Sequence, residues 1–250
     1  MNSSFTITQA GFVATTVIFF GLLLSRLRKS LAATSFAESK KKKIFNGTLI
    51  GLIAWAIVTA VLSLSGILSD FSSFPPKIGI VLIIPLVTII WLIRTTEVKE
   101  ILMHTPPESI IWLQSFRIVV EVLIWRLFVD NLAPIQMTFE GLNFDIISGL
   151  TALVVAYLVA NKKISSKLVI LWNFACLALL VNIVTVAILS MPTPFRVFMN
   201  EPANTIVTKF PIVWLPAFLV PLAYGLHFLS LRQWMGNGVI GDFANKEIRR

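Results

Sequence analysis

The chain has 250 residues, of which 56% are hydrophobic and only 13% are charged. Soluble domains carry about 25% charged residues, so this composition excludes an ordinary water-soluble globule and predicts an integral membrane protein. The 21 Lys and Arg outnumber the 12 Asp and Glu. In a membrane protein this excess is explained first by membrane topology, so no nucleic-acid partner is predicted. The single cysteine, Cys176, excludes an intramolecular disulfide.

Seven apolar stretches are candidates for transmembrane helices, because a bilayer core about 30 Å thick needs roughly 20 apolar residues per helix. We therefore predict an all-α, polytopic helical bundle that forms a single transmembrane domain over residues 1–250. The fifth stretch is short and would have to stand upright or thin the bilayer. In chain order, the stretches are residues 8–27, 46–68, 77–93, 110–129, 145–160, 167–190 and 211–231.

The positive charges predict the orientation of these helices. Of the 21 Lys and Arg, 16 fall at the loops of one side and 3 at the loops of the other, and 2 lie inside the fourth stretch. By the positive-inside rule, the N-terminus lies outside and the C-terminus in the cytoplasm. Basic residues follow the first stretch rather than precede it, which indicates a retained anchor and not a cleaved signal peptide.

A run of four lysines, Lys40, Lys41, Lys42 and Lys43, lies on the cytoplasmic side of the second stretch. The run is typical of a topology determinant. Each charge would also gain about 1 kcal/mol beside anionic lipid headgroups, so these headgroups are a candidate partner. Homo-oligomerisation is left open.

Small residues and prolines indicate how the helices pack. Ala152, Ala156 and Ala160 recur every four residues, as do Gly47 and Gly51, and such spacing predicts buried helix faces in close contact. The third and seventh stretches also share a pattern, in which Phe74-Pro75 precedes Pro85 and Phe210-Pro211 precedes Pro221. Two kinked helices at equivalent places would fit a parallel repeat of three helices on either side of the fourth.

The fourth stretch contains the polar residues on which the functional prediction depends most. An ionisable side chain at the bilayer centre costs at least about 2.5–3.5 kcal/mol, so several in one helix require partners or water. Helical spacing places Arg117 and Glu121 on one face, with Gln114 one turn earlier, and places Arg126 and Asp130 on roughly the opposite face, nearer the outside.

Three residues of the sixth and seventh stretches are expected at the same membrane depth as Arg117 and Glu121. They are Asn173, Tyr224 and His227. Their convergence with Gln114, Arg117 and Glu121 would form an intramembrane polar centre of the kind found in proton relays, ion paths and ligand sites. The alternative is that Arg117 and Glu121 neutralise each other and only hold helices together. His227 alone would also fit a hydrogen-bonded core histidine.

The outer loop before the fifth stretch supplies a second group of candidates. We expect Asn143 or Asp145 to cap the fifth helix, because a side-chain oxygen there accepts hydrogen bonds from free backbone N–H groups. Oxygens of Glu140, Asn143 and Asp145 are too few to predict a metal site. With Arg126 and Asp130, these three residues form the predicted outer group.

Four segments carry a resemblance to other proteins, namely Asp70 to Pro76, Gln114 to Arg117, Pro134 to Asp145 and Leu215 to Leu222. Together they resemble an uncharacterised family of bacterial multi-pass membrane proteins. The resemblance implies a bacterial inner membrane and transfers no activity.

The sequence favours a small-molecule or ion transporter or channel that uses the polar centre of the fourth helix. A membrane-embedded ligand-binding or sensing protein is the alternative, and an intramembrane enzyme using Glu121 and His227 as acid and base is the third. No catalytic residue and no cofactor is predicted, since no nucleophile or metal-ligand pattern accompanies them. A microbial rhodopsin is excluded because residues 211–231 contain no lysine for a retinal Schiff base.

Overall fold

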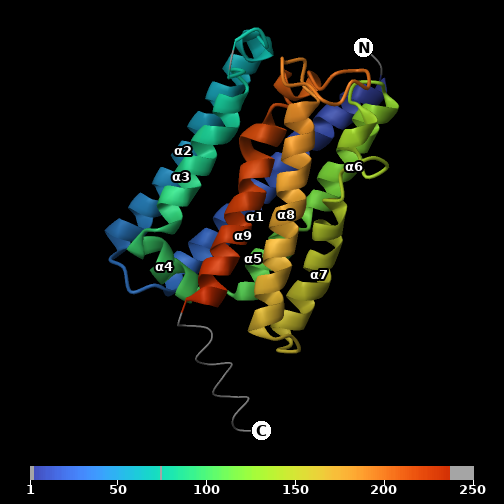
Figure 1. Ribbon diagram of the computed structural model, residues 1–250. Coiled ribbons are helices and arrows are strands. Elements are labelled where there is room, and N and C mark those ends of the chain that lie inside the picture. Colours follow the sequence, from blue (N-terminus) through green and yellow to red (C-terminus); the bar gives the residue numbers. More distant parts are fainter. Residues whose placement is uncertain (1–2, 74, 237–250) are drawn as a thin grey trace.

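The computed structural model describes residues 3–73 and 75–236, which fold into α-helices joined by turns and by longer, largely irregular connections (Figure 1). Phe74 of the proposed repeat and the basic residues Lys246, Arg249 and Arg250 lie outside the described residues. The helices are α1 (Ser3–Ala33), α2 (Glu38–Leu64), α3 (Gly79–Ile93), α4 (Thr96–Met103), α5 (Pro107–Leu113), α6 (Phe116–Val129), α7 (Ile146–Ala160), α8 (Ser166–Leu189) and α9 (Val220–Met235). Single turns of 3-10 helix lie in the connections, namely η1 (Ile67–Ser69), η2 (Ile135–Met137) and η3 (Ile206–Thr208). A π-helical turn, η4 (Leu215–Leu219), leads directly into α9.

Helical structure occurs in each of the seven predicted stretches, but only some helices have the length of a membrane span. Four described helices are long and apolar enough to cross a bilayer, and α3 with α4, bent by 73°, would make a fifth. The fourth stretch is not one helix, because it breaks between α5 and α6 at Gln114 and Ser115. The all-α fold with several candidate spans is therefore confirmed, and the count of seven stays a prediction.

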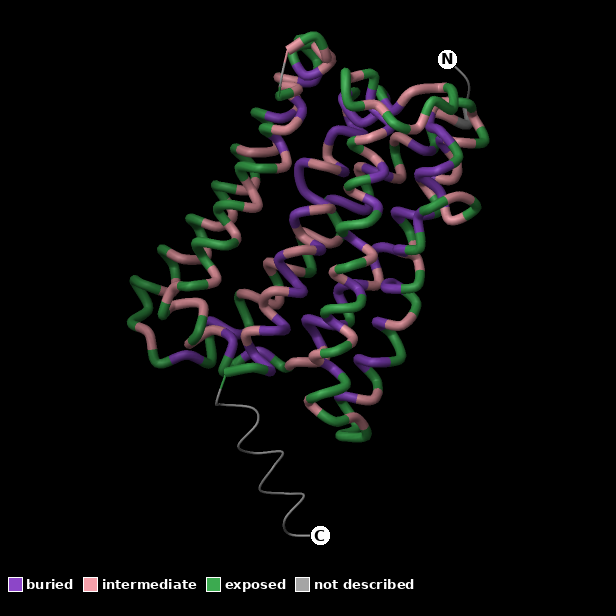
Figure 2. The backbone as a smooth tube through the Cα atoms, viewed as in Figure 1, coloured by how far each residue is buried: buried purple, intermediate pink, exposed green. Residues whose placement is uncertain are grey.

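The helices form a bundle in which α9 packs against α3, α5 and α8, while α1 lies against α6. The connections α1–α2, α3–α4 and α7–α8 share one end of the bundle with the end of α9, and the described start of α1 lies at the other end (Figure 1). Exposed residues follow the outer faces of α2 and α3 (Figure 2), and they include large apolar side chains such as Ile53 and Trp91. Such faces suit contact with lipid chains.

The segment between α6 and α7 is folded into the bundle. Gln136, Met137, Thr138 and Asn143 are buried although most of the segment is not helical. The Gln136 amide donates a hydrogen bond to the Ser190 hydroxyl at 3.0 Å. Irregular backbone is tolerated at membrane depth where protein surrounds it. The segment therefore adds buried backbone in front of α7, and the membrane span at the fifth stretch stays a prediction.

The small-residue stripes differ in what they contact. Ala152 and Ala156 are buried, as predicted, and α7 packs closely on α5, whereas Ala160 is exposed, contrary to the prediction. The prediction was wrong for Gly47 and Gly51, which are exposed and have no atoms near the position of an added Cβ. Spacing alone could not distinguish a helix–helix contact from a face turned outward.

The connection after α2 contains an ion pair whose titration we can predict. Lys77 Nζ donates a hydrogen bond to Asp70 at 2.7 Å, and the Ser72 hydroxyl donates at 2.6 Å. Lys77 and Ser72 lower the pKa of Asp70 from 3.8 to about 2. Because the folded pKa is depressed, the stabilisation is present above about pH 4 and is lost as the pH falls through about 2. Its size is small, since exposed ion pairs contribute little.

A carboxyl ¹³C NMR titration would measure this pKa directly. We expect the Lys77→Met variant to shift the pKa of Asp70 upward, toward its ordinary value of 3.8. Titration of the wild-type carboxyl near that ordinary value would show that the ion pair does not form in solution.

Candidate functional site

The centre of the site is an ion pair between α6 and the start of α7. Arg117 is 2% exposed and holds the Asp145 carboxylate with two donors, Nε at 2.6 Å and Nη2 on the second oxygen. This fork matches the two carboxylate oxygens and is among the stronger arrangements of an ion pair. Arg117 therefore pairs with Asp145 rather than with Glu121, which corrects the alternative in which Arg117 and Glu121 neutralise each other.

The expected capping role of Asp145 was also wrong. Asp145 occupies the N-cap position of α7, but its side chain accepts no hydrogen bond from the backbone of the first turn. Its oxygens are taken by Arg117 and by the Ser148 hydroxyl at 3.3 Å. Asn143 accepts the backbone N–H of Asp145 at 3.0 Å instead. The buried Arg117 guanidinium thus binds the Asp145 carboxylate, which would otherwise accept hydrogen bonds from the first backbone N–H groups of α7.

His227 and Asn173 join Arg117, as the predicted polar centre required. Arg117 Nη1 lies 2.9 Å from His227 Nε2, and His227 Nδ1 lies 2.9 Å from Asn173 Oδ1. Arginine can only donate, so Nε2 accepts and the ring proton resides on Nδ1, which donates to Asn173. The Asn173 amide in turn donates to Ser230 Oγ at 3.0 Å. The chain of bonds thus links α6, α8 and α9.

Glu121 lies on the same side of α6 and has a different partner. The Asn143 amide donates to Glu121 Oε2 at 2.5 Å and also to the Met137 carbonyl at 2.9 Å. Among the described residues, Glu121 takes part in no salt bridge. The polar centre therefore contains one balanced ion pair and one further carboxyl group.

The remaining predicted residues do not join this network. Gln114 is buried and donates to the Ala223 carbonyl at 3.2 Å, while Tyr224 is half-buried and its ring lies 6.0 Å from that of Phe228. Glu140 is exposed and accepts a hydrogen bond from Trp125 at 2.8 Å. Of the predicted outer group, Asn143 and Asp145 thus belong to the centre, whereas Glu140, Arg126 and Asp130 lie outside the cavity described next.

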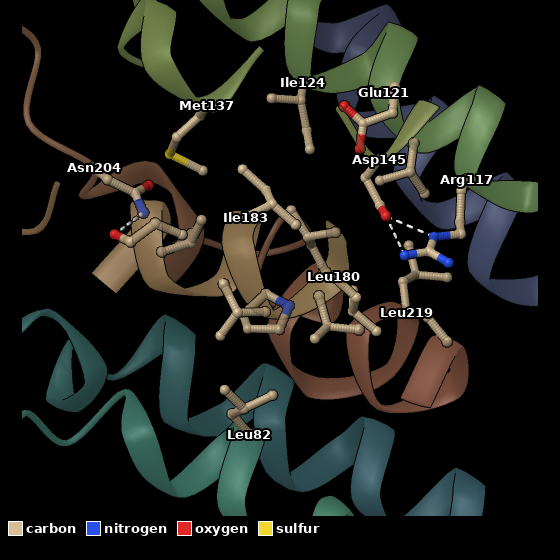
Figure 3. Close-up of a pocket in the computed structure, with 18 of the residues that line it drawn as sticks. Leu82, Arg117, Glu121, Ile124, Met137, Asp145, Leu180, Ile183, Asn204 and Leu219 are labelled. Carbon is tan, nitrogen blue, oxygen red and sulfur yellow. Dashed lines mark hydrogen bonds and ion pairs between the residues drawn. The ribbon is translucent and has the colours of Figure 1, made fainter. Parts of the chain in front are cut away.

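A cavity of about 90 Å³ borders the polar centre (Figure 3). One water needs about 10–15 Å³ on this measure, so the cavity has room for a short organic chain. Arg117, Glu121 and Asp145 lie at one end and Asn204 at the other, with Ile183 and Leu180 drawn between them (Figure 3). The side chains between the two ends are apolar and come from α3, α6, α8, η4 and α9.

Asn204 is the residue that sequence reasoning missed. It is fully buried in the connection between α8 and η3, and its amide donates to the Ala187 carbonyl at 3.0 Å. Its side-chain oxygen accepts no hydrogen bond from the described residues. Asn204 follows the sixth apolar stretch in an ordinary polar loop, so no pattern in the sequence distinguished it.

The fold and the buried polar centre define a helical protein with several candidate membrane spans, which indicates a multi-pass membrane protein. Residues 75–235 match a family described as a domain of unknown function (DUF8737), and the chain belongs to this family. No curated protein and no solved structure matches the chain.

Proposed function

We propose that this protein is a small-molecule transporter of a bacterial inner membrane, and that the transported molecule contacts Glu121 inside the cavity. The observation that carries the proposal is the position of Glu121, which lines the cavity while Arg117 is already neutralised by Asp145. Ionisable groups within membrane-spanning segments commonly mark substrate or ion paths.

We further propose seven spans with the N-terminus outside and the C-terminus in the cytoplasm. The shared position of the basic α1–α2, α3–α4 and α7–α8 connections supports this orientation (Figure 1). Lys42 and Lys43 are exposed near the start of α2, where anionic headgroups would reach them. Lys40 instead bonds Glu97 of α4 at 2.9 Å, and Lys41 bonds Glu38 at 2.9 Å.

The cavity wall includes the π-helical turn η4. Leu215, Pro216 and Leu219 of the π-helical turn η4 line the cavity, and π-helical turns are frequent at functional sites. Trp55 of α2 donates a hydrogen bond to the Ala217 carbonyl of this turn at 3.1 Å. A change in the turn would therefore be communicated to α2, as an alternating-access transporter requires.

The test is charge movement in vesicles. Purified protein in liposomes on a solid-supported membrane would receive concentration jumps of methylammonium, tetramethylammonium, pentylammonium or acetate. We expect at least one probe to produce a current above that of protein-free liposomes. We expect Glu121→Gln to reduce that current at least about tenfold, because it removes one charge-assisted contact.

Glu140→Gln is the matched control, since Glu140 is an exposed carboxyl outside the cavity. It should retain the wild-type current. Absence of current with all four probes, or equal currents from the wild type and Glu121→Gln, would refute the transport proposal.

A sensing role is the second candidate, favoured by the contact between the outer segment and the polar centre. Asn143 bonds both Glu121 and the Met137 carbonyl, so a ligand on this segment would act directly on the centre. Loss of a cellular phenotype after truncation of residues 138–143, in a protein without measurable flux, would favour sensing over transport.

A further inference from the structure

A second hollow lies between α1, α5 and α7 and opens to the outside of the bundle. Its volume is about 370 Å³, within the range of about 300–1,000 Å³ that is usual for small-ligand sites. The residues that line it include Arg26 of α1, Glu108 and Trp112 of α5, and Tyr157 of α7. None of these residues borders the cavity beside Arg117, so the hollow, here called the lateral groove, is a separate site.

The lateral groove contains two opposite charges that do not pair with each other. Arg26 and Glu108 both line it, but their charged atoms lie more than 4.0 Å apart. Among the described residues, neither side chain has a salt-bridge or hydrogen-bond partner. A bound molecule with a negative and a positive group close together would satisfy both, whereas an ion of one sign would be attracted by one and repelled by the other.

The lateral groove lies where lipid headgroups are expected. α1 is a candidate membrane span, and Arg26 lies near the end of α1 that leads to α2 (Figure 1). Ala160, which also lines the groove, is the last residue of α7 and lies at the same end of the bundle. Trp112 and Tyr157 are 44% and 60% exposed, and both residue types are enriched at the headgroup level of membranes. We therefore expect a lipid, rather than a dissolved molecule, to occupy the groove.

We propose that the lateral groove binds one phospholipid with a zwitterionic headgroup of the phosphatidylethanolamine class. The phosphate accepts hydrogen bonds from the Arg26 guanidinium, and the primary ammonium group donates to the Glu108 carboxylate. An acyl chain runs along α7 over Leu153, an exposed apolar residue of the groove one turn from Tyr157. This site lies apart from the cavity and goes beyond the proposed function, so neither proposal depends on the other.

Native mass spectrometry of the full chain in detergent would test the site with phosphatidylethanolamine, phosphatidylcholine and phosphatidylglycerol of identical acyl chains. Phosphatidylcholine keeps both charges, but its ammonium group has no N–H to donate, and phosphatidylglycerol has no positive group. Phosphatidylglycerol is the main rival, because Lys163 lies 6.0 Å from the centre of the Tyr157 ring and adds a positive charge beside the groove. We expect phosphatidylethanolamine to bind about tenfold tighter than either, the effect of one charge-assisted hydrogen bond.

Variants assign the two charges separately. Glu108→Gln should weaken phosphatidylethanolamine about tenfold and leave phosphatidylglycerol within about threefold, which also shows that the variant is folded. Arg26→Gln should weaken both lipids, since both carry the phosphate. Arg28→Gln and Glu100→Gln are the matched controls, because neither residue lines the groove although Arg28 lies on α1 and Glu100 on the neighbouring α4. Both controls should keep the wild-type affinities.

Three results would overturn the lipid assignment. The first is phosphatidylglycerol binding to the wild type as tightly as phosphatidylethanolamine, or more tightly. The second is a preference for phosphatidylethanolamine that persists in Glu108→Gln. The third is an Arg26→Gln variant that binds both lipids as the wild type does.

Discussion

Replacing Arg117 by alanine is expected to lower the free energy of unfolding by about 3–5 kcal/mol, because it leaves the buried Asp145 carboxylate without its cation. The same change removes a donor to His227 Nε2, so the chain of hydrogen bonds to Asn173 also loses its anchor. Thermal unfolding of the detergent-solubilised protein, followed by loss of the monodisperse peak, would report the loss as a lower Tm.

A double variant distinguishes the contribution of the ion pair to stability from the contribution of side-chain packing. Arg117→Leu combined with Asp145→Leu removes both buried charges, and buried pairs replaced by apolar residues often cost little. The double variant should therefore be more stable than Arg117→Leu alone. Arg94→Ala is the matched control, since Arg94 is exposed at the end of α3, and should change stability by less than about 0.5 kcal/mol. A double variant as unstable as the single one would show that the ion pair is not what stabilises this contact.

Gly149→Ala is the second change for which we expect a large effect. An added Cβ at Gly149 of α7 would lie 2.9 Å from the backbone nitrogen of Ile118 and 3.3 Å from Arg117 Cβ. Backbone cannot move aside as a flexible side chain can, so α6 and α7 must separate where the Arg117–Asp145 pair joins them. Overpacking of this kind costs about 1–3 kcal/mol.

Gly51→Ala provides the comparison for this prediction. The same methyl group meets no atom within 4 Å at Gly51, and alanine is the better helix former by up to about 1 kcal/mol. The Tm of Gly51→Ala should equal or exceed that of the wild type, while the Tm of Gly149→Ala should fall. Equal Tm values for the two variants would mean that α6 and α7 are not in close contact at Gly149.

The sequence predicted the helical class and part of the polar centre because both depend on local pattern. Hydropathy located apolar stretches, and an arginine and a glutamate four residues apart had to share a helix face. Because His227 and Asn173 were expected at the same membrane depth as Arg117, they were predicted to converge with it. The structure places His227 beside Arg117 and Asn173 beside His227.

The partners of the two charges could not be predicted, because they depend on how a connection folds back into the bundle. Asn143 and Asp145 were assigned to an outer loop, since a loop beside an apolar stretch is ordinarily at the surface. In the structure, the buried segment with η2 carries both residues inward to Glu121 and Arg117. Asn204 was missed for the same reason, as its burial follows from long-range packing against α8.

The folded-in segment before α7 also constrains how the protein is assembled in the membrane. Arg117 is synthesised 28 residues ahead of Asp145, so α6 is complete before its arginine has a partner. A buried arginine without its carboxylate is strongly destabilising, by about 3–5 kcal/mol. That cost falls only when Asp145 and the segment preceding α7 have been synthesised, so α6 reaches its folded packing together with α7 rather than before it.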